Sequence, residues 1–144
     1  MKRLLCVILV LCLFPAYALC VDFDSFNAYA AVFGATEIDP SKALEAKGLT
    51  ICTVGVQRVT FSEDEDGSLK RIFIEGDGVD FLAYSMAAIM MFDPSSDNYA
   101  VNAGQLLSAF LLSRTQSESA GATVEGNVFL IQAQNKGFVF TIGK

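Results

Sequence analysis

The chain of 144 residues contains no histidine and no tryptophan. Without imidazole, the Ser-His-Asp and Cys-His forms of nucleophilic catalysis are excluded. Most zinc and iron sites are disfavoured as well, because they depend on histidine ligands. The sequence also lacks a Gly-x-Ser-x-Gly motif, a Ser-x-x-Lys motif and a phosphate-binding glycine loop. We therefore expect a protein that is not an enzyme and that binds no cofactor and no metal.

Positive charge is scarce. Lysine and arginine together number 10, against 16 aspartates and glutamates, and the formal net charge is −6. An acidic protein repels phosphate groups, which argues against nucleic acid as a partner and disfavours anionic membrane surfaces. The expected partner is therefore another protein, whose identity the sequence does not specify.

The first eighteen residues have the pattern of a secretory signal. Lys2 and Arg3 precede an unbroken apolar stretch of 11 residues, 4–14, which ends at Pro15. The small-x-small sequence "AYA" follows and ends at Ala18, where signal peptidase is expected to cut. We predict that residues 1–18 are a cleaved signal peptide and that residues 19–144 form one domain, whose formal charge is then −8.

Two alternatives to cleavage after Ala18 remain open. The first is a retained membrane anchor, but 11 helical residues span only roughly half of the ~30 Å hydrocarbon core. The second is a lipoprotein that begins at Cys20, although Leu19 and Tyr17 fit that cleavage pattern poorly. We expect a bacterial periplasmic or secreted protein without a membrane span after cleavage. The absence of an Asn-x-Ser/Thr sequon is consistent with this expectation.

Four cysteines occur, and two of them, Cys6 and Cys12, lie in the signal segment. Cys20 and Cys52 remain after cleavage, as a pair in an oxidising compartment. A disulfide bond between them is the simplest expectation. The alternative is a buried thiol at Cys52 and a loose one at Cys20.

The helical patterns predict two short N-terminal helices and two central ones. Asp24 is expected to cap the first, and Asp39 with Pro40 to begin the second, which ends before Gly48. The central helices cover residues 79–92, which are nearly all apolar, and a segment that starts at Asp93, or at 102 if glycine breaks it.

The strand patterns predict two hairpins. Residues 49–61 and 68–76 are expected to pair through a turn at 65–67. A second hairpin is expected around a three-residue turn at 135–137, with Phe129, Ile131 and Ala133 on one face of the first strand and Phe138, Phe140 and Ile142 on one face of the last. The hydrophobic alternation slips near Gln57–Arg58, which indicates a bulge or a strand buried on both faces. We predict a small single α+β domain, with about four antiparallel strands and the two central helices packed on the sheet.

Three features are candidates for function. The acidic run "EDEDG", residues 63–67, offers oxygens for calcium but lacks the complete loop pattern, and a solvated turn explains it. Two carboxylates could act as the acid and base of a hydrolase. The methionine-rich helix offers a candidate interface, for which we name Met86, Ile89 and Met90, and the last helix offers a similar one through Phe110; plain core is the alternative for these residues.

The sequence therefore favours a small exported protein without catalysis, which acts by binding another protein as an accessory subunit, inhibitor or chaperone-like factor. The alternatives are a self-associating structural protein that forms a homodimer through a sheet edge or the methionine-rich helix, and, further behind, a carboxylate-based hydrolase.

Overall fold

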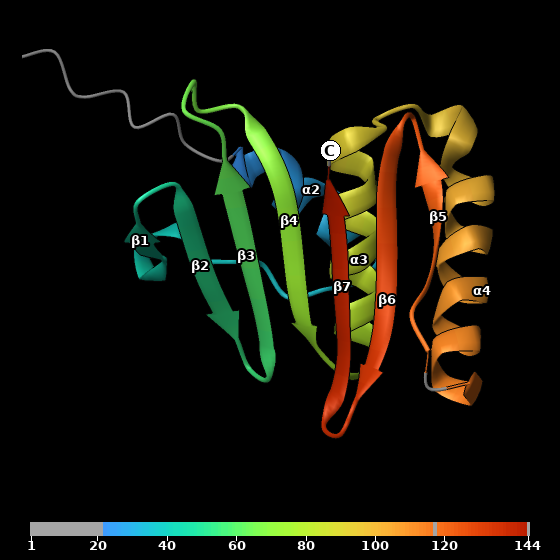
Figure 1. The fold of residues 1–144 in the computed structure, drawn as a ribbon. Helices are drawn as coiled ribbons and strands as arrows, with labels where there is room; N and C mark the ends of the chain where they lie inside the picture. The colour runs from blue at the N-terminus through green and yellow to red at the C-terminus, as the bar shows by residue number, and fades with distance from the viewer. Residues whose placement is uncertain (1–21, 117, 144) are drawn as a thin grey trace, which may run out of the picture.

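The computed structural model describes residues 22–116 and 118–143, which form a seven-stranded antiparallel sheet in the order β1-β2-β3-β4-β7-β6-β5 (Figure 1). Residues 1–18, the predicted signal, lie outside the described residues, as does Cys20. The strands are β1 Leu44–Ala46, β2 Leu49–Val54, β3 Gln57–Glu63, β4 Leu69–Gly76, β5 Ala120–Val124, β6 Asn127–Gln134 and β7 Gly137–Gly143. The helices are α2 Phe23–Val32, α3 Gly78–Phe92 and α4 Tyr99–Gln116, with short 3-10 turns η1 Pro40–Lys42 and η2 Ser96–Asn98.

The three α-helices of the described residues lie on one side of the sheet, and no described helix covers the other side (Figure 1). Because side chains alternate between the two faces of a strand, every second residue points towards the helices. These inward residues are fully buried on the four central strands and make the core: Val59, Phe61, Ile72, Ile74, Phe129, Ile131, Phe140 and Ile142.

Helix α3 is buried on nearly all sides, as its uniformly apolar sequence predicts. It packs on the sheet through β4 and β7, and α2 and α4 contact it from its flanks. The ring of Phe26 in α2 lies 5.1 Å from Phe61 of the sheet and 6.0 Å from Tyr84 of α3. This aromatic cluster joins the N-terminal helix to both layers.

The predicted fold class is wrong in its number of strands and helices. The sheet has seven strands rather than about four, and three α-helices cover it rather than two, although an α+β class remains compatible. The first missed turn lies inside residues 49–61. Val54 pairs with Gln57, and Gly55 has a positive φ of 60°, so the slip in alternation is a tight hairpin turn rather than a bulge.

The second missed turn joins β5 to β6. Val124 pairs with Asn127, and the two residues between them have positive φ, 46° at Glu125 and 77° at Gly126. This is the backbone of a type I′ turn, in which the first position usually holds asparagine, aspartate or glycine. Because glutamate is unusual at this position, the sequence did not predict the turn. By contrast, both predicted hairpins are present, since β3 pairs with β4 and β6 with β7; the second turn, however, holds only Asn135 and Lys136, because Gly137 already pairs with Gln134.

The predicted second helix is also wrong. Asp39 caps only the single 3-10 turn η1, and the residues that follow it form β1, which pairs with β2 through a turn at Lys47–Gly48. The first helix is capped by Asp22 instead of Asp24. The last helix, α4, begins at Tyr99 and runs through Gly104 without a break.

Candidate protein-binding groove

A groove of about 200 Å³ lies between α3 and α4 and is lined by apolar side chains alone. Four of the eight lining residues come from α3, three from α4, and one from the end of α2. They are Phe33, Val79, Leu82, Ala83, Met86, Ala103, Leu106 and Leu107.

Helical spacing places these residues on the groove. Positions 79, 82, 83 and 86 follow the i, i+3, i+4, i+7 pattern of one helix stripe, and 103, 106 and 107 do the same on α4. Asp77 fixes where α3 begins, because its carboxylate Oδ1 accepts a hydrogen bond from the N–H of Gly78 at 2.7 Å. Two apolar stripes therefore face each other across a shallow gap.

The rim of the groove is exposed to solvent. Val79 is 76% exposed, Leu107 50%, and Leu111, one turn further along α4, 57%. Isolated exposed apolar residues are ordinary on a protein surface, but a continuous apolar groove with an exposed rim is typical of an interaction site. Covering it with an apolar partner removes this surface from water, which is favourable.

Of the four residues predicted as an interface, only Met86 lines this groove. Ile89 and Met90 are fully buried in the core. The methionine-rich part of α3 therefore belongs mainly to the core. The exposed apolar side chain of α3 lies nearer the start of the helix, at Val79.

Phe110, the fourth predicted residue, faces a different hollow. Its ring lies 4.5 Å from that of Phe138 on β7, and both line a cavity of about 470 Å³ together with Asp77 and Arg114. This cavity carries charged and polar groups as well as apolar ones, so it differs in chemistry from the groove.

Cys52 is buried, and burial raises the pKa of its thiol to about 11. It forms no disulfide bond with any residue in 22–116 or 118–143. Its expected partner, Cys20, lies outside the described residues, so the Cys20–Cys52 bond stays a prediction.

Thiol labelling tests this bond. We expect no reaction of the folded mature protein with maleimide at neutral pH, because the predicted bond engages both cysteines; a reduced Cys52 would in addition be buried and protonated. In denaturant without reductant, the predicted disulfide bond leaves no thiol to label, and reduction then adds two labels per mature chain. Labelling in denaturant before reduction contradicts the bond.

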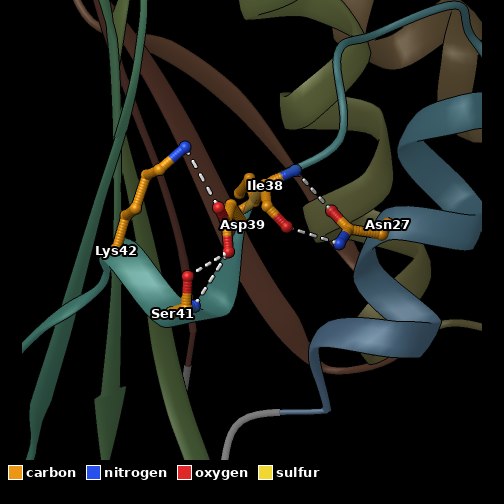
Figure 2. A network of polar contacts seen from close by, with 5 residues as sticks. All are labelled: Asn27, Ile38, Asp39, Ser41 and Lys42. Carbon is orange, nitrogen blue, oxygen red and sulfur yellow. Dashed lines mark hydrogen bonds and ion pairs between the residues drawn. The ribbon is translucent and has the colours of Figure 1, made fainter.

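Several carboxylates that a hydrolase would need are engaged as local caps. The Asp22 carboxylate accepts hydrogen bonds from the hydroxyl and the N–H of Ser25, at 2.6 and 3.0 Å. Asp39 accepts the same pair from Ser41 and forms an ion pair with Lys42 at 3.1 Å (Figure 2). The Ser25 and Ser41 hydroxyls lower the pKa of Asp22 and of Asp39 respectively, so both remain ionised at neutral pH.

Figure 2 also shows how the segment before β1 is anchored. The side-chain amide of Asn27 in α2 donates to the carbonyl of Ile38 at 2.8 Å and accepts from its N–H at 2.9 Å. This two-way bond ties α2 to the chain that leads into the sheet.

The acidic run at 63–67 forms the turn between β3 and β4, with Gly67 at φ 78°. Lys70 pairs with Asp64 at 3.0 Å, and Asp66 accepts from the N–H and hydroxyl of Ser68. Over the part of the chain that the structure describes, no three histidine, cysteine, aspartate or glutamate side chains gather as a metal site would require. The contacts of Asp64 and Asp66 therefore stabilise the turn between β3 and β4.

Comparisons with known proteins add no function. No family model, curated protein or solved structure matches this chain. Within residues 22–116 and 118–143, none of the helices is both long enough and apolar enough to cross a membrane.

Most groove residues were missed by sequence reasoning. Val79, Leu82 and Leu107 look like ordinary members of apolar helix stripes. The local sequence does not predict which of these stripes stays exposed once the neighbouring helix has packed. The one available signal was the excess of apolar positions on α4 beyond a single core-facing stripe, at 107, 111 and 112.

Proposed function

We propose that this chain is a small exported, non-catalytic protein that binds another protein in the bacterial envelope or medium. The observation that carries the proposal is the groove between α3 and α4, in which all eight lining residues are apolar and the rim is exposed. A site of this composition favours recognition by shape and apolar burial over chemistry.

The groove suits the apolar stripe of a partner's helix. An extended peptide needs main-chain donors and acceptors from the site, and the side chains of this groove provide none. A helix satisfies its own main chain and presents side chains only, at positions i, i+3, i+4 and i+7. We therefore infer a helical partner segment with apolar residues on one face.

Two other functions have less support. A carboxylate-based hydrolase needs two free acids across a cleft, whereas Asp22, Asp39 and Asp77 each cap a helix or turn. Self-association through the groove would hide the same apolar surface. It would also bring together two copies that each carry a net negative charge.

Matched glutamate variants test the proposal. Tagged wild-type protein and the variants Leu107→Glu and Leu130→Glu would be purified from native envelope and medium fractions. Leu130, on the uncovered sheet face, is the control because its 44% exposure is close to the 50% of Leu107. We expect all three to fold, and only Leu107→Glu to lose a stoichiometric partner, with affinity reduced at least about tenfold.

Two results would contradict the proposal. One is a partner that Leu107→Glu retains and Leu130→Glu loses, which moves the site to the sheet face. The other is a wild-type chain that elutes as a dimer, while Leu107→Glu elutes as a monomer, which makes the groove a self-association surface.

A further inference from the structure

The two edges of the sheet are built differently. At one edge, β1 has three residues, includes Glu45, and is flanked by Lys42 and Lys47. Short length and charge are the usual devices that stop an edge strand from pairing with another chain. At the other edge, β5 has the sequence Ala-Gly-Ala-Thr-Val, without charge, proline or bulge. The second edge therefore lacks these devices, and α4 packs beside it.

The register shows which main-chain groups are free at this edge. Val124 and Asn127 flank the two-residue turn and exchange hydrogen bonds, so the main-chain groups of residues 124, 122 and 120 face β6. The groups of Gly121 and Thr123 then point away from the sheet. Among the described residues, no hydrogen bond joins either of them to another segment.

A groove of about 490 Å³ lies between α4 and β5 at this edge. Figure 1 shows α4 beside β5. None of its nine lining residues is ionisable, and most are small: Ala100, Val101, Gly104, Gln105, Ser108, Ala109, Leu112, Gly121 and Ala122. The side-chain oxygen of Gln105 is buried there without a hydrogen-bond partner. The groove thus offers room for a main chain and apolar contacts.

Charge identifies the occupant. Glu118 precedes β5 and Glu125 follows it, and both are exposed. If a second copy paired its β5 antiparallel here with Gly121 opposite Thr123 of the copy, Glu118 would lie opposite Gly126 of the copy, one position from its Glu125. Like charges so placed are unfavourable. A strand with an uncharged centre and basic residues at both ends would instead place positive charges near Glu118 and Glu125, which is favourable.

We propose that the edge of β5 binds an extended polypeptide segment, uncharged over about five residues and flanked by lysine or arginine, as an eighth strand of the sheet. This site is separate from the groove between α3 and α4 and does not depend on the function proposed for it.

A synthetic peptide tests the site. The probe is Lys-Arg-Ala-Val-Thr-Val-Ala-Arg-Lys, and the control peptide carries glutamate at its four basic positions. We expect the basic peptide to bind the full mature chain and to slow hydrogen exchange at the amides of Gly121 and Thr123. The acidic peptide is expected to bind at least about tenfold more weakly.

Proline variants supply the matched control. Thr123→Pro removes an outward N–H without touching the β6 ladder, and Glu45→Pro does the same at the β1 edge. We expect Thr123→Pro to keep its thermal stability and to weaken peptide binding by about tenfold, and Glu45→Pro to bind normally.

Three outcomes would overturn the inference. They are no binding of the basic peptide, binding that Thr123→Pro leaves unchanged, and a wild-type dimer that Thr123→Pro dissociates, since the last would make a second copy the occupant. Leu107→Glu should leave peptide binding intact, which separates this site from the α3–α4 groove.

Discussion

Replacement of Met90 by aspartate is expected to abolish folding. Met90 is fully buried in the core, where α3 meets the other layers. The substitution removes a packed side chain, which costs about 2–5 kcal/mol, and places a carboxylate in an apolar site, which costs several kcal/mol more. Together these are comparable with the whole stability of a domain, about 5–15 kcal/mol. Circular dichroism and sizing would show an unfolded or aggregated chain.

The control for this prediction is Leu107→Asp, at the groove rim. Leu107 is half exposed, so its carboxylate stays in water and the fold is expected to survive with a melting temperature close to that of the wild type. Met90→Leu, which nearly conserves volume, should cost less than about 1.5 kcal/mol. A folded Met90→Asp variant of normal stability would show that Met90 belongs to a surface and not to the core.

Replacement of Asp93 by alanine is the second large effect. The Asp93 carboxylate is buried and accepts hydrogen bonds from the side-chain amides of Asn102, at 2.8 Å, and Asn98, at 3.0 Å. Asn102 is itself buried at the start of α4, so the variant leaves an amide without its acceptor. We expect a loss of about 3 kcal/mol in unfolding free energy, and a melting temperature lower by about 10 °C.

The same contact makes stability depend on pH. The Asn102 amide, with smaller help from Asn98 and the N–H of Ser95, lowers the pKa of Asp93 in the folded protein. A lowered folded pKa means that this stabilisation is present above the unfolded value and is lost as the pH falls through the folded one.

Asp93→Asn is the matched control for the pH effect, since it keeps the shape but cannot titrate. The difference in unfolding free energy between wild type and Asp93→Asn should therefore shrink as the pH falls from neutral through the ordinary range of an aspartate and below it. A difference that stays constant over this range would mean that the Asn102 contact does not favour the ionised form.

The sequence allowed some elements to be predicted because their signals are local. The uniform apolarity of 79–92 marked a buried helix, and Gly67 and Gly137 marked their hairpins, since a positive φ favours glycine. The strand count failed where the signal was weak. At Glu125 a non-glycine residue takes a positive φ, and at Gly55 a two-residue turn resembles a slip in alternation.

The candidate site was harder to predict for a physical reason. An apolar stripe in the sequence shows only that one face of the helix is apolar. Whether that face is exposed to solvent depends on the distance between this helix and the element packed beside it. Met86 and Met90 are one turn apart in the same apolar run and both are buried, yet only Met86 also borders the groove. That distinction follows from the packing of α4 against α3, which no local pattern specifies.

The central claim, that the α3–α4 groove binds a partner protein, is tested most directly by photo-cross-linking in living cells. A photoreactive amino acid would replace Leu107, with position 130 as the control site and Val79→Glu as a second variant that blocks the groove. We predict one heterologous adduct at position 107, absent at position 130 and lost in Val79→Glu. No adduct at 107, an adduct with twice the mass of this chain, or an adduct that survives Val79→Glu would contradict the claim.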